Sequence, residues 1–146
     1  SHVWNRTGHE NGIYPNNYKY SDIRKWLNND FLQQAFCYDS SLIQTANVDN
    51  SAESTGYTDN QYACEDTKDK VYLLSYKDVK NEDYGFTDDA SRIAYDADGE
   101  AYTYWLRSPY YYDTYARCVY YNGYVPSDYI VDNCYFVRPA LTRKLD

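Results

Sequence analysis

The sequence predicts a single domain of the α+β class, with short helices first and a small antiparallel sheet later. Its 146 residues suit one hydrophobic core. An amphipathic helical pattern lies near the N-terminus, whereas strand and turn patterns dominate from residue 102 onward. Neither a strand–helix–strand alternation nor an internal repeat is present, which disfavours a parallel sheet or a solenoid.

Residues 21–36, S-D-I-R-K-W-L-N-N-D-F-L-Q-Q-A-F, are expected to be helical. Ser21 can cap the helix and Asp22 suits its first turn. The polar run at 28–30 could divide it into two short helices. The apolar positions form one stripe: Ile23, Trp26, Leu27, Phe31 and Ala35.

The rest of the chain alternates short apolar runs with polar loops. Residues 42–48 and 70–75 are predicted strands, 49–59 a loop, 76–81 a helical turn and 83–100 an acidic irregular segment. Residues 104–107 and 136–141 are further strands. Asn122-Gly123 is a strong hairpin signal, so 116–121 and 124–131 should pair.

Charge and cysteine usage exclude several classes of partner. The net charge of −8 disfavours nucleic acid and anionic membranes, and no segment resembles a membrane span. Both histidines lie in the first nine residues, and Cys37, Cys64, Cys118 and Cys134 lack metal-ligand spacing; two disulfides or four thiols remain open. Residues 96–100 faintly resemble a calcium loop but lack its later ligands, so no metal or other cofactor is expected.

Tyrosine is the unusual residue of this chain, with 21 copies against four phenylalanines. A hydrophobic core would accept phenylalanine equally well. An excess of tyrosine therefore suggests rings displayed at a binding surface, as in antibody loops. Half-buried tyrosines on ordinary strands are the alternative, and composition alone does not separate the two.

Residues 108–141 differ in composition from the residues before them. They contain no Lys, Glu, Gln, Met or Trp, whereas residues 1–107 contain six Lys, five Glu, four Gln and three Trp. None of the five missing residues has a codon ending in a pyrimidine. Codons derived from AAC or AAT and randomised only at adenines would produce this bias, with Asn, Tyr, Asp and Ser enriched. That is the signature of a diversity-generating retroelement.

Several stretches stand in order along the chain: Y-S-D-I-R-K-W-L-N at 20–28, D-K-V-Y-L-L-S at 69–75, W-L-R-S-P at 105–109 and V-R-P-A-L at 137–141. Together they resemble a large family of bacterial and phage domains that is similar to the formylglycine-generating-enzyme branch of the C-type lectin fold. Some of its members are variable proteins of diversity-generating retroelements. The resemblance starts at about Tyr18. Two departures are that residues 1–19 look like a shortened start and that Phe136 replaces a common glycine.

The resemblance implies a C-type lectin fold whose residues 102–141 form a variable binding region on a fixed framework. Trp105 and Leu106 are expected to pack beneath it, and Arg107 and Arg138 to tie loops together rather than touch ligand. The expected framework also includes Ala116, Arg117, Val119, Gly123, Val125, Val131 and residues 137–141. The residues expected to face the ligand are Tyr110, Tyr111, Tyr112, Asp113, Tyr115, Cys118, Tyr120, Tyr121, Tyr124, Ser127, Asp128, Tyr129, Asn133, Cys134 and Tyr135.

Three functions compete at this point. The first is a non-enzymatic receptor or adhesin, displayed on a bacterial cell surface or phage particle, that binds a protein on another cell or particle. The second is a carbohydrate-binding lectin whose tyrosines stack on sugars. The third is an oxidase of the formylglycine-generating kind, which would need Cys118 and Cys134 as a copper-binding pair. The same two cysteines could instead form a disulfide or be products of randomised codons. The receptor is the preferred interpretation.

Overall fold

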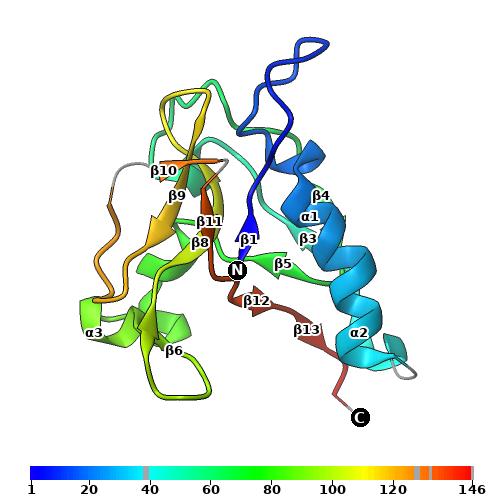
Figure 1. Ribbon diagram of the computed structural model, residues 1–146, viewed down its shortest axis with the longest axis vertical. Helices are drawn as coiled ribbons and strands as arrows, with labels where there is room; N and C mark the ends of the chain where they lie inside the picture. Colours follow the sequence, from blue (N-terminus) through cyan, green and yellow to red (C-terminus); the bar gives the residue numbers. More distant parts are fainter. Residues whose placement is uncertain (38–39, 127–128, 132, 146) are drawn as a thin grey trace.

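The computed structural model describes residues 1–37, 40–126, 129–131 and 133–145, without the side chains of Tyr129, Ile130 and Cys134. It is an α+β domain of short helices and small antiparallel sheets, as predicted. A helical rod lies along one side and the longest strands along the other (Figure 1). The helical elements are η1 (Tyr18–Tyr20), α1 (Asp22–Trp26), η2 (Leu27–Phe31), α2 (Leu32–Phe36), η3 (Ser40–Leu42), η4 (Glu53–Thr55), η5 (Asp78–Lys80), η6 (Glu82–Tyr84) and α3 (Asp89–Arg92). The strands are β1 (His2–Val3), β2 (Ile43–Gln44), β3 (Ala46–Val48), β4 (Thr67–Asp69), β5 (Tyr72–Leu73), β6 (Ala94–Tyr95), β7 (Ala101–Tyr102), β8 (Tyr104–Pro109), β9 (Tyr115–Val119), β10 (Tyr129–Ile130), β11 (Cys134–Tyr135), β12 (Pro139–Ala140) and β13 (Thr142–Arg143).

The predicted helix forms without a break. The Ser21 hydroxyl caps α1 by accepting a hydrogen bond from the backbone N–H of Arg24 at 3.3 Å. The polar run at 28–30 lies in η2, a π-helical turn that separates α1 from α2, so the suggested division into two short α-helices is confirmed, although the chain stays helical through the turn. From this turn the Asn28 side chain reaches the segment between β4 and β5, where it donates to the Val71 carbonyl at 2.8 Å and accepts from the Lys70 N–H at 2.9 Å.

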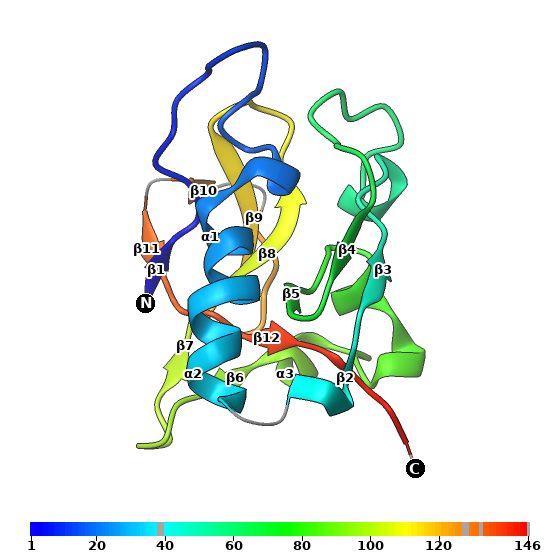
Figure 2. The ribbon, with the colours of Figure 1, turned by 90° about the vertical axis from the view of Figure 1, so that its right-hand side faces the viewer.

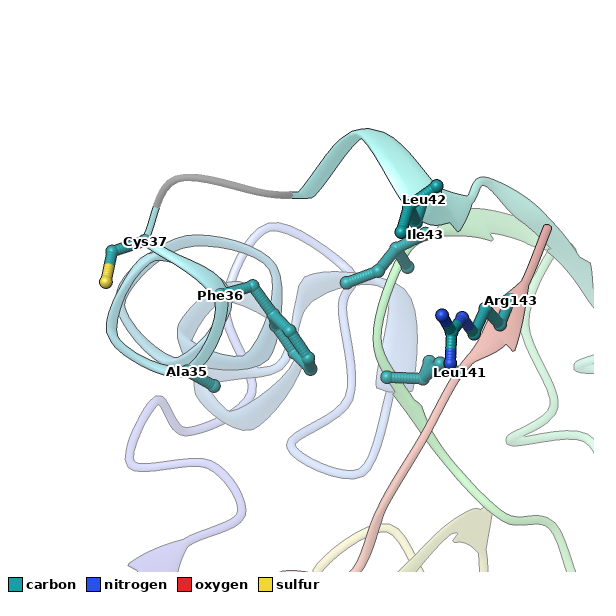
Figure 3. A pocket seen from close by; sticks show the side chains of 7 residues that line it. All are labelled: Ala35, Phe36, Cys37, Leu42, Ile43, Leu141 and Arg143. Carbon is teal, nitrogen blue, oxygen red and sulfur yellow. The ribbon is translucent and has the colours of Figure 1, made fainter. Parts of the chain in front are cut away.

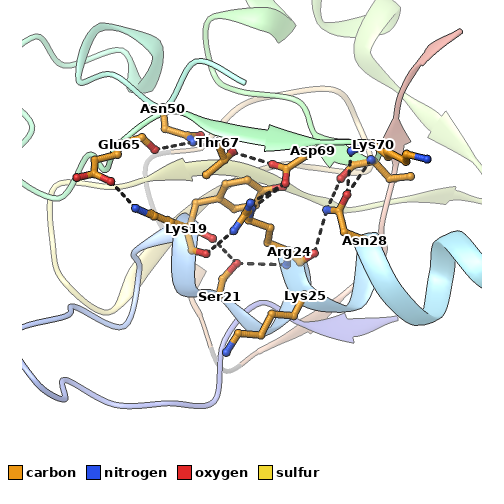
Figure 4. Close-up of polar contacts among 12 residues, drawn as sticks. Lys19, Ser21, Arg24, Lys25, Asn28, Asn50, Glu65, Thr67, Asp69 and Lys70 are labelled. Atoms are coloured by element: carbon orange, nitrogen blue, oxygen red, sulfur yellow. Dashed lines mark hydrogen bonds and ion pairs between the residues drawn. The ribbon is translucent and has the colours of Figure 1, made fainter. Parts of the chain in front are cut away.

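A buried ion pair fastens the helix to the β3–β4 ladder (Figure 4). Arg24 meets the carboxylate of Asp69 at 2.8 Å, and the Thr67 hydroxyl donates to the same carboxylate at 2.7 Å. The Asp69 side chain is 1% exposed. Because the carboxylate accepts from both groups, its buried negative charge is compensated. The ion pair also fixes the position of α1 against β4.

The longest strands form the three-stranded sheet β10–β9–β8, which separates two hydrophobic clusters. Trp105 pairs with Cys118 and packs into the first cluster, next to Trp4. Tyr104 pairs with Val119 and packs into the second. Both faces of this sheet are therefore buried, and every residue of β8 is inaccessible. The expected burial of Trp105 and Leu106 is confirmed.

Residues 1–19 belong to this core. β1 pairs antiparallel with β11, and Trp4 is fully buried. Two indole N–H groups fix the segment: Trp4 donates to the Leu106 carbonyl at 2.9 Å, and Trp105 donates to the His2 carbonyl at 3.0 Å. The start of the chain thus supplies an edge strand and a core side chain.

The remaining strand predictions hold in part. Residues 42–48 contain β2 and β3, residues 70–75 contain β5, and residues 76–81 contain η5. Only Pro139–Ala140 of the predicted strand 136–141 pairs in a ladder, with β5. Phe136 makes an isolated parallel bridge to Tyr104 and lies 4.7 Å from the Tyr102 ring, so the bulky residue is accommodated at the surface.

The segment 96–100 is the turn between β6 and β7. The Asp96 carboxylate accepts from the backbone N–H groups of Asp98 and Glu100, both at 2.9 Å. That carboxylate therefore stabilises the turn by accepting hydrogen bonds from its backbone. Over the part of the chain that the structure describes, no helix has both the length and the apolar content to cross a bilayer.

Candidate functional site

Three loops that are distant in sequence lie together at one end of the molecule. They are residues 5–17, 49–66 and 110–114, and both ribbon views show them at the top (Figures 1 and 2). Side-chain amides join them: Asn60 donates to the Pro109 carbonyl at 3.1 Å, at the base of the third loop, and Asn16 of the first loop donates to the Tyr112 carbonyl of the third at 2.7 Å. We call this region the loop end.

The β8–β9 loop, residues 110–114, is held by one fully buried side chain. The Asn16 amide donates to the Tyr112 carbonyl at 2.7 Å and to the Tyr115 carbonyl at 3.1 Å. Its backbone N–H donates to the Asp113 carbonyl at 3.0 Å. The loop also closes on itself through Tyr110 N–H to the Tyr115 carbonyl, at 2.9 Å. Because its carbonyls are bonded inward, the loop has a defined backbone from which side chains project.

Five aromatic rings project from this loop and its neighbour, and we call them the tyrosine cluster. Adjacent rings pack edge-to-face or tilted, with centroids 5.5–5.9 Å apart. Tyr111 is 40% exposed and Tyr112 is 59% exposed, whereas the other three are half-buried. The members are Tyr57, Tyr110, Tyr111, Tyr112 and Tyr115.

Arg117 lies beneath the cluster and is 5% exposed. Its guanidinium lies 3.7 Å from the ring centroid of Tyr76, 5.5 Å from that of Tyr57 and 5.8 Å from that of Tyr110. It also donates to the Thr55 carbonyl at 3.0 Å. Burial lowers the pKa of this guanidinium. Among the described residues no carboxylate pairs with it, so the ring faces are its main electrostatic partners.

One acidic side chain touches the exposed part of the cluster. The Tyr111 hydroxyl donates to the Asp59 carboxylate at 3.1 Å. This hydrogen bond, together with the negative charge, raises the pKa of Tyr111. The ring therefore carries a neutral hydroxyl with a fixed direction at physiological pH.

A second group of exposed tyrosines lies at the other end of β9. Tyr121 and Tyr124 are 63% and 54% exposed, on either side of the Asn122-Gly123 turn. The turn packs against α3, and the Arg92 side chain of that helix donates to the Gly123 carbonyl at 2.9 Å. Figure 1 shows the chain running past α3 after β9, away from the loop end. Over the described part of residues 108–141, the exposed tyrosines thus form two groups rather than the single face that the sequence suggested.

The predicted hairpin forms only at its base. Tyr129 pairs with Ala116 and Ile130 with Tyr115, which is the register that a two-residue Asn122-Gly123 turn requires. Among the described residues, the pairing of β9 with β10 ends at Ala116 and Tyr129. The turn itself lies against α3, where Arg92 donates to the Gly123 carbonyl.

The residues expected to face a ligand fall into four groups. Tyr111, Tyr112, Tyr121, Tyr124 and Asn133 are exposed. Tyr110, Asp113, Tyr115, Tyr120 and Tyr135 are half-buried, and the rings of Tyr120 and Tyr135 pack against the first core cluster. Cys118 is fully buried. Ser127 and Asp128 lie outside the described residues, as do the side chains of Tyr129 and Cys134.

The expected display of Cys118 is therefore wrong. It stands opposite Trp105 on the paired strand and shares its face of the sheet, which is covered by the first core cluster. An alternating in–out pattern does not apply to a strand with both faces buried. The proposed bridge between Cys118 and Cys134 depends on a side chain that lies outside the described residues.

The two arginines of the sequence motifs have the structural roles expected of them. Arg107 is 4% exposed and donates to the Asp49 and Leu73 carbonyls and to the Asp78 carboxylate, the last at 2.7 Å. Arg138 donates to the Tyr104 hydroxyl at 3.0 Å. The expected framework positions Ala116, Arg117, Val119, Gly123, Val125 and Val131 are all buried. Val137, Arg138 and Ala140 are half-buried, while Pro139 and Leu141 are exposed, so the last motif is covered only in part.

The partners that come from outside residues 102–141 were not predicted from the sequence. Tyr57 and Asp59 lie in a segment predicted only as a polar loop, and Asn16 and Asn60 had no assigned role. A tyrosine inside a Gly/Ser/Thr-rich loop was a usable signal, because such a ring is rarely needed for a loop. Nothing in the local sequence of Asn16 indicates that it anchors a loop almost one hundred residues away.

Groups of three or more His, Cys, Asp or Glu side chains with metal-binding geometry are absent from the described part of the chain. No curated protein and no solved structure shows significant similarity to the sequence. One family model does match, over residues 2–145, nearly the entire chain. The chain therefore belongs to the family described as a domain of unknown function, DUF6273.

Proposed function

We propose that this chain is a ligand-binding domain of the C-type-lectin-fold kind whose loop end recognises a protein partner. We further propose that it is a variable protein of a diversity-generating retroelement, displayed on a bacterial cell surface or phage particle. One observation carries the proposal: exposed tyrosine rings stand on a loop whose backbone is held by the buried Asn16.

This arrangement suits binding for a physical reason. A tyrosine brings a large contact area with only two side-chain torsions to order, and a hydroxyl that can meet polar groups. Ordering a mobile loop would cost further free energy on binding, and the inward hydrogen bonds of residues 110–115 remove most of that cost beforehand. Tyr111 and Tyr112 can therefore act as anchors for a protein surface.

The proposal of diversification is tested by sequencing the gene and its neighbourhood. We expect a reverse-transcriptase gene and a near-copy of the segment encoding residues 108–141, differing from it only at template adenines. In a population of the host, codons for Tyr111 and Tyr112 should vary, whereas those for the buried Trp105 and Leu106 should not. A near-copy whose differences fall equally on all four bases would contradict the proposal.

The binding role itself is tested by display. Two libraries are compared, one randomised at Tyr110, Tyr111 and Tyr112 and the other at the exposed Tyr84 and Tyr95 outside the loop end. Selection against a panel of folded proteins should give specific binders from the first library at least about tenfold more often. Equal success from both libraries would show that the loop end has no special aptitude for recognition.

Carbohydrate binding is a second candidate because of a separate polar pocket. A cavity of about 320 Å³ is lined by Tyr72, Tyr84, Asn47, Asn81 and Lys77 among others. Tyr84 is 62% exposed, so its ring face is open for stacking. Binding on a glycan array that Tyr84→Ala abolishes, while Tyr95→Ala does not, would favour a lectin over a protein receptor.

The oxidase alternative gains nothing from the geometry. It needs two cysteines that reach both copper and substrate, and Cys118 is fully buried. A binding role is therefore the proposal that the described residues support best.

A further inference from the structure

A pocket is lined by residues at the C-terminal end of α2 and in the segments of β2 and β13 (Figure 3). Figure 1 shows the end of α2 and β13 at the end of the molecule away from the loop end. The volume of the pocket is about 420 Å³, within the range of small-molecule sites. Phe36 at the end of α2 forms one wall, Leu42 and Ile43 form another, and Leu141 with Arg143 forms the third.

Strand pairing places the cation of this pocket among apolar side chains. Arg143 stands directly opposite Ile43 in the β13–β2 ladder, so the two side chains share one face. Leu141, two residues earlier, projects to the same side as Arg143. Figure 3 shows Phe36 and Ile43 pointing toward the space that Leu141 and Arg143 border.

The charge in this pocket is uncompensated within the described ranges. The ion pairs formed there by other arginines and lysines do not include Arg143, which is exposed. A guanidinium beside an apolar cavity suits a carboxylate, which it can meet with two parallel hydrogen bonds. The pocket therefore combines one group that can bind an anion with several apolar side chains.

The helix sets the orientation of such a ligand. The carbonyl end of α2 reaches Cys37 and carries partial negative charge, on the side of the pocket opposite to Arg143. An acid group is therefore favoured near Arg143, with an apolar tail directed toward Phe36. We propose that this pocket binds small amphipathic carboxylic acids, of the class of medium-chain fatty acids.

Octanoate is the probe that tests the proposal, with octanol as its uncharged analogue, titrated into isotope-labelled protein by NMR. We expect saturable shifts at Phe36, Ile43 and Leu141, and octanoate binding at least about fivefold tighter than octanol. Lengthening the acid to decanoate should tighten binding by up to about 15-fold, from about 0.8 kcal/mol for each added methylene.

Two matched variants separate the guanidinium from general charge. Arg143→Gln should weaken octanoate about fivefold and leave octanol unchanged, whereas Lys144→Gln, which removes the neighbouring charge, should change neither. Both side chains are exposed, so neither variant threatens the fold. Equal weakening by the two variants, or octanoate shifts at residues outside the pocket, would overturn the proposal. Neither result bears on the loop end, which shares no residue with this pocket.

Discussion

The two ends of β9 carry the same kind of residue but are built in opposite ways. At the loop end, the backbone of residues 110–115 is held from below by the Asn16 side chain, and the rings stand clear. At the Asn122-Gly123 turn, the backbone itself is pressed onto α3, and Gly123 is buried while Tyr121 and Tyr124 project around it. The first end depends on hydrogen bonds from a side-chain amide, whereas the second combines the Arg92 hydrogen bond with the absence of a side chain at Gly123.

This difference teaches where sequence variation can be tolerated. Exposed rings at either end can change without altering the anchors beneath them. The anchors cannot change, since one is a buried amide that must satisfy loop carbonyls and the other is a glycine at φ +83°. A framework of this kind separates the residues that determine folding from those that determine binding.

The largest effect is expected from Gly123→Ala. A Cβ at this position would lie 1.7 Å from the Asp89 carbonyl oxygen, and the positive φ adds strain. We expect a loss of about 2–5 kcal/mol in the free energy of unfolding, measured by urea denaturation. Gly99→Ala is the control, because Gly99 has φ +82° but open space around it, and should lose only about 1–2 kcal/mol. Equal losses would show that contact with α3 is unimportant.

Asn16→Ala should come next, with a loss of about 1–3 kcal/mol, because the carbonyls of Tyr112 and Tyr115 each lose one of two donors and keep only a backbone N–H. Amide hydrogen exchange should accelerate in residues 110–115 and stay unchanged at the Gly123 turn. The exposed Asn29, which bonds only to the Lys25 carbonyl among the described contacts, provides the control variant Asn29→Ala. Unchanged exchange in the loop would disprove its dependence on Asn16.

A smaller effect is expected on the ionisation of Tyr111. Its pKa is raised by Asp59, so the neutral hydroxyl is favoured in the folded protein. The stabilising hydrogen bond is present below the usual tyrosine pKa of about 10 and is lost as the pH rises through the folded value. Asp59→Asn should lower the Tyr111 pKa, followed by NMR of labelled tyrosine. Asp83→Asn removes an equal charge far from the tyrosine cluster and should leave the Tyr111 pKa unchanged.

The sequence predicted the local features of this fold better than the distant ones. The Ser21 cap and the hairpin register follow from spacing over a few residues, and both are found. The apolar helix stripe holds for Ile23, Trp26, Leu27 and Phe31, which pack in or against the first core cluster, whereas Ala35 is exposed. The division of the helix at residues 28–30 was predicted, but its π-helical form was not, and neither were the hydrogen bonds that Asn28 accepts from the backbone N–H groups of Lys70 and Val71. Helix signals describe the chain alone, whereas such contacts depend on what packs beside it.

The candidate site shows the same limit. Composition predicted exposed rings, and four of the tyrosines whose side chains are described in residues 108–141 are exposed. It could not show that these rings divide between two ends of β9, because that depends on the direction of the strand. Cys118 was misplaced because both faces of the sheet are covered, by Trp105 and its neighbours on one side and by Leu106 and its neighbours on the other.

The central claim is that the exposed rings are dispensable for folding. The most direct measurement compares the free energy of unfolding of two variants. One replaces four exposed tyrosines by serine, at Tyr111, Tyr112, Tyr121 and Tyr124, and should lose less than about 2 kcal/mol in total. The other is the single change Tyr18→Ser, which removes a fully buried ring and should lose about 3–5 kcal/mol. If the quadruple variant were the less stable of the two, the rings would belong to the framework and the account would be contradicted.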